Sequence, residues 1–329
     1  MVMREKSIVT GTKRTLRVAA VQMISETGRI ADNLRRATGF VEEASRRGAK
    51  LILLPEFMPP GYCWRKEIWN GAEPREGPTV KWLKETSKRL GIWLGTSYLE
   101  ADGKDFYNTF VLTNPDGAED GRVRKHSPAL GEACFTRGGA DLQVISTQLG
   151  KIGVAICYDN HFAYTSRNMY SQSVDLMLQP HLSPTATVNK LTAEKAAKFI
   201  NERIRKLPMT YADMLGIPVI LCNQTGYWHS PAPGLGAAED IPLDGHSSIV
   251  DSDGTTKAQL STEEGVIVED VILDPALKKD VPPHAYGRWA MPNVPTTMQN
   301  WPLIEAILSI WYKFSRERKL RAREISLQK

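Results

Sequence analysis

The chain alternates short apolar runs with segments of helical periodicity, and this alternation constrains its fold more than any other feature. The runs are a few residues long, many are rich in valine and isoleucine, and several are continuous enough for strands buried on both faces. They occupy residues 17–23, 50–54, 92–99, 109–113, 151–157, 175–179, 218–222, 247–251 and 265–273.

Helical patterns fall between these runs. After the first run, the apolar positions of one helix face are Leu34, Ala37, Phe40, Val41 and Ala44. Asp32 is placed to cap the start of this helix and Gly48 to stop it. A second helix is predicted over residues 79–90, and a third over 189–207, before Pro208 interrupts or restarts it.

Strands that alternate with helices predict an α/β layered fold. The chain has 329 residues, of which 42% are apolar, so it can bury a large core, and no linker-like segment divides it. We predict a flexible N-terminus over residues 1–16, one domain over 17–292 and a C-terminal helical extension over 293–329.

The C-terminal segment holds the charge excess of the chain. The net charge is +5, and residues 313–329 alone contain seven basic and two acidic residues. A basic segment can contact nucleic acid or an anionic surface. However, the apolar residues have helical spacing, which favours an amphipathic helix that docks on the protein's own core or on a partner subunit. These residues are Leu303, Ile307, Ile310, Trp311 and Phe314. We therefore expect no nucleic acid and no membrane among the partners.

Several classes of protein are not indicated. The first sixteen residues lack an apolar export segment, and no apolar run reaches the roughly 18 residues of a membrane-spanning helix. Cys63, Cys134, Cys157 and Cys222 show neither zinc-site spacing nor a disulfide framework. No glycine-rich phosphate loop follows a strand. These features predict a cytoplasmic protein without metal or cofactor.

Three residues that are far apart in the sequence have the chemistry of covalent acyl transfer. Glu56 closely follows the run at 50–54, Lys125 lies within a basic stretch, and Cys157 ends the run at 151–157. A thiol attacks as the thiolate and needs a base, and the oxyanion that its attack creates needs a fixed positive donor. A carboxylate can be the base without any histidine.

Taken singly, each residue has an ordinary structural explanation. Glu56 suits a charged residue after a strand, Lys125 a solvated basic run, and Cys157 a buried structural cysteine. A carboxylate at the mouth of a buried strand, however, is partly desolvated, which raises its pKa toward useful basicity. The end of a strand is also where a nucleophile can meet a substrate.

Together, in this order, Glu56, Lys125 and Cys157 resemble the triad of the nitrilase superfamily of carbon-nitrogen hydrolases. The resemblance covers about residues 17–273. Its further motifs are residues 18–22, Asn33, 55–56, 107–109, 124–125, Glu132, 157–159, Asn223, 245–251 and Gly254. It implies a four-layer α-β-β-α sandwich whose protomers pair through helices, so a homodimer or higher homo-oligomer is expected.

The resemblance also implies a role for each matching residue. Cys157 would be the nucleophile, Glu56 the general base and acid, and Lys125 the cation that binds the oxyanion together with the backbone N–H of Tyr158. Glu132 matches the supporting carboxylate. In the implied reaction, Glu56 takes the thiol proton, the thiolate attacks the carbonyl carbon, and Glu56 protonates the departing amine. Water then hydrolyses the thioester and gives a carboxylic acid and ammonia or an amine.

The residues after the nucleophile favour an amide substrate. True nitrilases usually have Cys-Trp-Glu where residues 157–159 are Cys-Tyr-Asp, a sequence similar to many amide and carbamoyl hydrolases. Carbamoyl-amino-acid hydrolases often carry one or two basic residues just after this motif and Pro-Glu a few residues later. Here Pro-Glu is absent, and Arg167 is the one basic residue retained. Arg167 either binds a substrate carboxylate or pairs with a structural carboxylate such as Asp159. The family's Arg-Ala-x-Glu-Asn stretch is replaced by residues 207–213.

Loops at the strand ends supply candidates for a substrate pocket. The expected substrate-binding residues are Tyr62, Asn108, Tyr158, His161, Phe162 and His181, with Trp64, Tyr164, Gln224 and Trp228 as further candidates. Their aromatic character favours an apolar or aromatic acyl group, although aromatic side chains also serve as packing.

The sequence thus predicts a cofactor-free hydrolase that acts on a small amide through a cysteine thioester. Two enzymatic alternatives remain: a nitrilase, in which the thiol adds to a carbon-nitrogen triple bond, and an N-carbamoyl amide hydrolase. A third alternative is a binding or scaffold protein on an inactive hydrolase fold. The four filled positions of the triad and its supporting carboxylate argue against this last alternative.

Overall fold

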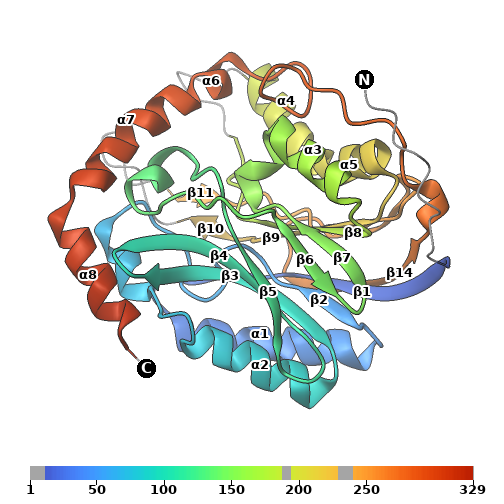
Figure 1. Ribbon diagram of the computed structural model, residues 1–329, viewed down its shortest axis with the longest axis horizontal. Helices are drawn as coiled ribbons and strands as arrows, with labels where there is room; N and C mark the ends of the chain where they lie inside the picture. Colours follow the sequence, from blue (N-terminus) through green and yellow to red (C-terminus); the bar gives the residue numbers. More distant parts are fainter. Residues whose placement is uncertain (1–11, 187–193, 229–239, 329) are drawn as a thin grey trace.

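The computed structural model describes residues 12–186, 194–228 and 240–328. Two six-stranded sheets pack face to face, and helices cover the outer face of each, so the layers follow the order α-β-β-α (Figure 1). The expected sandwich is confirmed. Within the described ranges, no helix has the length and apolar character needed to cross a membrane.

The first sheet joins the N-terminal strands to the last long strand. Its order is β14 (Gly265–Leu273), β1 (Arg14–Gln22), β2 (Leu51–Leu53), β3 (Trp93–Asp102), β4 (Asp105–Thr113) and β5 (Glu119–Arg124). β1, β2 and β3 run parallel, whereas β14, β4 and β5 are antiparallel to their neighbours. β2 is buried throughout, as expected for a central strand with both faces covered.

The second sheet has a similar plan. Its order is β13 (Thr256–Gln259), β12 (Ser248–Val250), β9 (Val219–Asn223), β8 (Leu176–His181), β7 (Gly150–Val154) and β6 (Val144–Thr147). β7, β8 and β9 are parallel at its centre. A short separate pair is formed by β10 (Tyr227–Trp228) and β11 (Ile241–Pro242). Parallel central strands in both sheets bring several strand ends to one region of the molecule.

Helices form the outer layers (Figure 1). α1 (Ile30–Arg46) and α2 (Pro78–Leu90) cover the first sheet, while α3 (Ala163–Gln172), α4 (Glu194–Arg205) and α5 (Leu207–Leu215) lie on the side of the second. The 3₁₀ helices are η1 (Lys66–Gly71), η2 (Leu130–Cys134), η3 (Cys157–His161) and η4 (Pro275–Leu277). The chain ends in α6 (Thr296–Gln299), α7 (Trp301–Phe314) and α8 (Arg316–Ser326).

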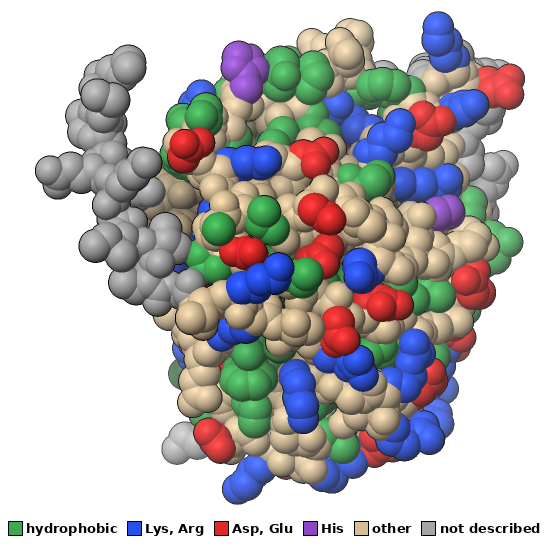
Figure 2. All heavy atoms as spheres, turned by 90° about the vertical axis from the view of Figure 1, so that its right-hand side faces the viewer, with side chains coloured by type: hydrophobic (Ala, Val, Ile, Leu, Met, Phe, Trp, Pro, Cys, Tyr) green, Lys and Arg blue, Asp and Glu red, His purple; other side chains and the backbone are tan. Residues whose placement is uncertain are grey.

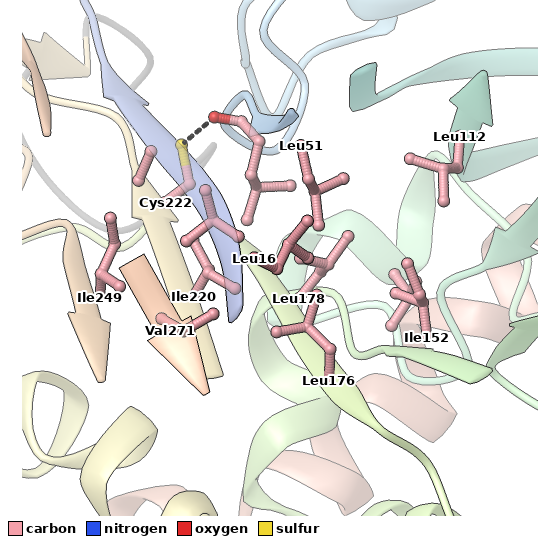
Figure 3. Close-up of a cluster of buried hydrophobic side chains, with 14 of the residues drawn as sticks. Leu16, Leu51, Leu112, Ile152, Leu176, Leu178, Ile220, Cys222, Ile249 and Val271 are labelled. Atoms are coloured by element: carbon pink, nitrogen blue, oxygen red, sulfur yellow. Dashed lines mark hydrogen bonds between the residues drawn. The ribbon is translucent and has the colours of Figure 1, made fainter. Parts of the chain in front are cut away.

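Aliphatic side chains from both sheets fill the space between them (Figure 3). Leu51 of the first sheet and Leu178 and Ile220 of the second are at most 1% exposed. Burying such a side chain is worth roughly 1.5–3 kcal/mol, so this layer supplies much of the stability. The thiol of Cys222 lies in the same layer and donates to the carbonyl oxygen of Leu53 at 3.2 Å.

The structure corrects two local expectations and agrees with a third. Arg14 already pairs with Leu273, so the predicted flexible N-terminus is wrong for residues 14–16, while residues 1–11 lie outside the described part. Asp32 does not cap α1, because the helix begins at Ile30 and Asp32 lies in its first turn. Gly48, with φ of +87°, follows the end of the helix as expected.

The predicted helix over residues 189–207 is divided in the structure. Residues 189–193 lie outside the described part, α4 spans Glu194–Arg205, and a new helix begins at Leu207 with Pro208 in its first turn. Proline is well accommodated there because the first N–H groups of a helix have no intrahelical acceptor.

The C-terminal helices run along one edge of the sandwich (Figure 1). Tyr312 and Arg318 anchor them, since both are buried and both bond to the carboxylate of Asp105 in β4. The apolar stripe was expected to dock on the protein's own core or on a partner subunit, and the core leaves most of it uncovered. The residues of this stripe are exposed, and so is their neighbour Ile304. We call these six residues the α7 apolar face: Leu303, Ile304, Ile307, Ile310, Trp311 and Phe314. Only Trp311 among them stacks on a core ring, that of Trp69.

Basic and acidic side chains are intermixed over the face that carries β1 and β14 (Figure 2). Arg17 and Asp270, which lie opposite each other on these two strands, form one such pair at 2.7 Å. Exposed pairs of this kind add little to stability. The surface pattern here therefore gives no reason to expect a polyanionic partner on this face.

Candidate active site

Glu56 lies where the two sheets meet. It follows the central strand β2, and its backbone N–H donates to the carbonyl oxygen of His181 in β8 at 3.3 Å. Its own carbonyl oxygen accepts from Nε2 of Gln224, just after β9, at 2.7 Å. Bonds from both sides of the sandwich thus fix the backbone from which the carboxylate projects.

The three predicted charged residues form one buried cluster. Nζ of Lys125 donates to Oε1 of Glu56 at 2.8 Å and to Oε2 of Glu132 at 2.6 Å. The side chains are at most 3% exposed. Lys125 is held here because it directly follows β5 and its backbone N–H donates to the carbonyl oxygen of Asn108 in β4. The sequence prediction that these residues meet agrees with the geometry.

Asn108 joins the two carboxylates. Its Nδ2 donates to Oε1 of Glu56 at 2.7 Å and to Oε1 of Glu132 at 3.2 Å. Sequence reasoning placed Asn108 among the substrate-binding residues, whereas its amide nitrogen is engaged in orienting these two groups. The missed signal is its position in β4, the strand that pairs with the one that leads to Lys125.

Cys157 begins η3 in a backbone conformation that a side chain rarely adopts. Its φ is +49°, and Nδ2 of Asn160 stabilises the turn by donating to the carbonyl oxygens of Cys157 and Ala155 at 3.0 and 2.9 Å. Such strain persists where the surroundings hold it, often at functional sites. The Sγ atom lies 3.8 Å from the carbonyl oxygen of Leu182, and the residue is half-buried.

Burial dominates the electrostatics of this cluster. It raises the pKa of the Glu56 carboxyl, which the charge of Lys125 and a hydrogen bond from the Cys157 thiol oppose. Burial, followed by the carboxylate of Glu56, also raises the pKa of the Cys157 thiol far above its usual range. Burial lowers the pKa of Lys125, but Glu132 and Glu56 outweigh it and keep the ammonium charged. At neutral pH the thiol is therefore protonated beside a carboxylate that can accept its proton.

Neither buried histidine near the cysteine suits the role of base. Burial, together with the charge of Lys125, lowers the pKa of His181 to about 3. Burial also lowers the pKa of His161 well below its ordinary value. His181 is in addition hydrogen-bonded through Nε2 to Asn160 and through Nδ1 to Ser183, each at 3.0 Å. Glu56 is the carboxylate that contacts the thiol.

Asp159 connects the nucleophile turn to the loop after Lys125. Its carboxylate accepts from the backbone N–H groups of His126 and Ser127 at 2.9 and 2.8 Å, and from the hydroxyl of Tyr164 at 2.8 Å. The expected pairing of Asp159 with Arg167 is wrong, because Arg167 is exposed on α3 and forms no ion pair within the described residues. Backbone donors replace the expected guanidinium.

Aromatic residues gather beside Leu182, the residue whose carbonyl oxygen faces the thiol. The ring of Trp228 lies 4.6 Å from that of Trp64 and 5.7 Å from that of Tyr62. Nε1 of Trp64 donates to the hydroxyl of Tyr62 at 2.6 Å. The predicted candidates Tyr62, Trp64 and Trp228 are thus brought together near the cluster.

The other predicted pocket residues are placed differently. The rings of Tyr158 and Phe162 pack against each other at 4.8 Å and into a cluster with Trp289, so the structure puts them in the core. Tyr158 is the second residue of η3. The first N–H groups of a helix have no acceptor within the helix, so the backbone N–H of Tyr158 can donate to a substrate oxygen. His161 is buried, and Tyr164 is partly exposed.

One residue near the cluster was not predicted. Glu305 of α7 accepts the backbone N–H of Leu130 at 3.1 Å, and Leu130 begins η2, which carries Glu132. A sequence signal exists, because Glu305 is a lone carboxylate in the apolar stretch 301–312. The pattern reveals no partner, since the contact spans 175 residues.

The chain is similar to carbon-nitrogen hydrolases over most of its length. The model of the carbon-nitrogen hydrolase family matches residues 17–276. An omega-amidase of Danio rerio is 30% identical over 255 residues, which are 74% of this chain and 83% of that protein. An N-carbamoylputrescine amidase of Arabidopsis thaliana is 29% identical over 179 residues, 52% of this chain, and the match spans 60% of the plant protein.

Solved structures share the fold. A carbon-nitrogen hydrolase from Helicobacter pylori matches with a TM-score of 0.69 and 17% identity over 92% of this chain and 96% of its own. An amidase from Nesterenkonia sp. matches with a TM-score of 0.64 and 20% identity over 79% and 91%. Because the family model spans most of the sequence and the fold agrees throughout, this chain belongs to the carbon-nitrogen hydrolase family.

Proposed function

We propose that this protein hydrolyses a small amide through a thioester on Cys157. The observation that carries the proposal is the buried ion cluster in which Lys125 bonds to both Glu56 and Glu132 beside the thiol. A protonated thiol, an adjacent carboxylate and a fixed ammonium are the groups that acyl transfer requires. Family membership supports hydrolysis of a carbon-nitrogen bond.

The steps follow from the positions of these groups. Glu56 takes the thiol proton as Sγ of Cys157 attacks the carbonyl carbon. The negative charge that develops on the carbonyl oxygen is stabilised by Nζ of Lys125 and the backbone N–H of Tyr158. Glu56 then donates the proton to the leaving nitrogen, which departs as ammonia or an amine. The same carboxylate activates water to hydrolyse the thioester and release the acid.

We prefer an amide substrate to a nitrile because residues 157–159, Cys-Tyr-Asp, are similar to the sequence of many amide hydrolases. Among the relatives, an omega-amidase and an N-carbamoylputrescine amidase support amide or carbamoyl substrates, and a protein of Pyrococcus abyssi is named a nitrilase. These names belong to proteins that are about 30% identical to this chain, so the acyl group is not fixed by them.

Ammonia release from matched amides and nitriles tests the proposal. We expect the purified protein to release ammonia from aliphatic amides and to leave the matching nitriles unchanged, and we expect Cys157→Ala to be inactive. Mass spectrometry of the unaltered protein quenched during turnover should detect an acyl adduct on Cys157, whereas Glu56→Gln should form no adduct from amides, because both the attack and the departure of the nitrogen need this carboxylate. Turnover of nitriles alone would replace the amidase with a nitrilase, and turnover of neither would refute the proposal.

We also propose that the protein is a homodimer that resides in the cytoplasm. The α7 apolar face lies on the surface, and pairing with a second copy about a two-fold axis would cover apolar residues with apolar residues. Self-pairing also agrees with the helix-mediated dimers of related enzymes. All four cysteines are free thiols, which suits a reducing compartment.

A further inference from the structure

A groove lies between the C-terminal helices and the loops that follow β3, β5 and η2. Its volume is about 510 Å³, which is in the range of sites for small molecules. Neither the candidate triad nor Glu132 is among the described residues that line it. The groove is therefore a different space from the candidate active site, and no step of the proposed amide hydrolysis uses it.

α7 presents a polar face to this groove. Three of its polar residues line the groove, each four positions after the last: Glu305, Ser309 and Lys313. A helix that serves only for packing turns its apolar stripe toward the core. Here the α7 apolar face is exposed instead, and it lies on a different side of the helix. The groove is thus left with a polar wall, which suits a polar ligand better than a packed core.

Basic side chains dominate the walls of the groove. The two acidic residues that line it already have partners. Asp105 accepts from Arg137 at 2.8 Å and also from Arg318. Glu305 accepts from the backbone N–H of Leu130 at 3.1 Å. Against these two carboxylates stand five basic side chains: Lys104, Arg137, Lys313, Arg318 and Lys319.

Three of these cations have no counterion in the described part of the chain. Lys104, Lys313 and Lys319 form neither an ion pair nor a side-chain hydrogen bond with any described residue. They come from three places in the fold: the turn between β3 and β4, the end of α7, and α8. Like charges that face one space repel each other, and a bound anion would relieve that repulsion.

The groove also borders the loop that carries two residues of the candidate active site. His126, which directly follows Lys125, lines the groove, and its backbone N–H donates to Asp159 at 2.9 Å. The Nε2 atom of His126 is buried without a hydrogen-bond partner among the described residues. Thr136 lines the groove as well, and its backbone N–H donates to the carbonyl oxygen of Glu132 at 2.9 Å. A ligand in the groove would therefore contact this loop.

We propose that this groove binds a small anion with two or more charged groups, either phosphates or carboxylates. The ammonium groups of the three lysines and the N–H groups of Arg137 that Asp105 does not use would donate to its oxygen atoms. More than one charged group is needed because the lysines come from separate elements around the groove. The bound anion would join α7 and α8 to the loop beside them and would stabilise the folded protein by mass action. This proposal does not depend on the amidase function.

Titration calorimetry with inorganic pyrophosphate and with citrate tests the groove. We expect at least one of them to bind with a Kd below about 1 mM at about 0.15 M salt, and monovalent acetate to bind far more weakly. Tighter binding of pyrophosphate would indicate a phosphate ligand, and tighter binding of citrate a polycarboxylate. We expect Lys104→Gln combined with Lys319→Gln to weaken binding about 10- to 100-fold, the range of a charge-assisted hydrogen bond, and to reduce the rise in melting temperature that the anion causes.

Lys50→Gln combined with Lys257→Gln is the matched control, because it removes the same charge from exposed positions outside the groove. The control should leave Kd within about twofold. Equal weakening by the two pairs would mean that the anion responds only to net charge, and it would overturn the proposal, as would a failure of both anions to bind.

Acetylation of lysines, read by mass spectrometry, locates the bound anion without any substitution. The anion should protect Lys104, Lys313 and Lys319 and leave Lys50 and Lys257 reactive. Unchanged reactivity of the three groove lysines at a saturating anion concentration would place the anion elsewhere and refute the site.

Discussion

At the scale of single residues, the candidate site depends on one cation shared by two buried carboxylates. Nζ of Lys125 lies within 2.8 Å of an oxygen of each of Glu56 and Glu132. With all three groups ionised, the cluster has an excess negative charge, and the charge of Glu132 raises the pKa of Glu56, which makes Glu56 a better acceptor for the thiol proton. Loss of the lysine would remove the oxyanion donor and leave two like charges buried together.

We predict that Lys125→Ala lowers kcat by about 10²- to 10³-fold, the usual effect of removing an oxyanion donor. The protein should lose stability, because two like charges stay buried together, but it should remain folded, because the core between the sheets is unchanged. Steady-state kinetics and circular dichroism check both parts. A folded variant with kcat within fivefold of the unaltered protein would show that Lys125 does not stabilise the transition state.

Asn108 distinguishes positioning of the carboxylates from contact with substrate. Because its Nδ2 bonds to both Glu56 and Glu132, we expect Asn108→Ala to lower kcat about tenfold with little change in KM, as for the loss of a hydrogen bond to charged groups. The midpoint of the pH profile of kcat should also shift, because Asn108 no longer donates to the two carboxylates. A rise in KM at unchanged kcat would instead favour the substrate-binding role predicted from the sequence.

At the scale of elements, the C-terminal helices reach both the site and the sheet. Glu305 of α7 bonds to Leu130, at the start of the 3₁₀ helix that carries Glu132. Arg318 of α8 and Tyr312 of α7 bond to Asp105 of β4. These helices are thus part of the domain's support, although the sequence suggested an extension.

Glu305 gives stability a pH dependence. Burial raises the pKa of its carboxyl to about 7, so the folded protein binds a proton more tightly than the unfolded chain does. Its contribution to stability is therefore present below about pH 4.5 and declines as the pH rises toward 7. We expect Glu305→Gln to lessen the fall in melting temperature between pH 5 and pH 8, as measured by thermal unfolding. An unchanged pH dependence would contradict this assignment.

Asp105 anchors the terminal helices through buried partners. We expect Asp105→Asn to lower the free energy of unfolding by roughly 3–5 kcal/mol, because Arg318 would be left as a buried, unpaired charge. Burial raises the pKa of Asp105, but Arg137 and Arg318 outweigh it and hold the pKa below its ordinary value. This contribution is thus present at neutral pH and lost as the solution becomes strongly acidic.

Urea denaturation of the variants measures the effect of Asp105→Asn. Asp102→Asn is the control, since Asp102 is 58% exposed and pairs with Arg124 at the surface. The control should cost at most about 1 kcal/mol. Equal losses of unfolding free energy in the two variants would mean that the buried pair of Asp105 and Arg318 stabilises the protein no more than a surface ion pair does.

At the scale of the whole molecule, the α7 apolar face predicts self-association. Light scattering after size exclusion should give twice the chain mass of 36.7 kDa. Replacing Ile307 and Ile310 together with aspartate should give a folded monomer, because two charges would be buried in the contact. Val281→Asp, at another exposed apolar position, should leave the dimer intact. A monomeric unaltered protein would refute the proposed pairing.

The sequence determined the features that depend on local pattern. Apolar runs and helical periodicity located most central strands, because strands buried on both faces consist of continuous apolar residues. The order of Glu56, Lys125 and Cys157 identified the candidate triad through its resemblance to a family. Edge strands such as β5 and β13 were not predicted, since their polar, partly or fully exposed residues lack such a pattern.

Tertiary structure decided what depends on partners distant in the chain. The amide of Asn108 orients two carboxylates, and Glu305 reaches a loop 175 residues away. Asn108 was expected to bind substrate, and Glu305 is a lone carboxylate in an apolar stretch, but neither pattern reveals the partner that the fold supplies. Their roles arise from burial and from which neighbours the fold supplies, and burial determines the cost of a charge and the value of a hydrogen bond.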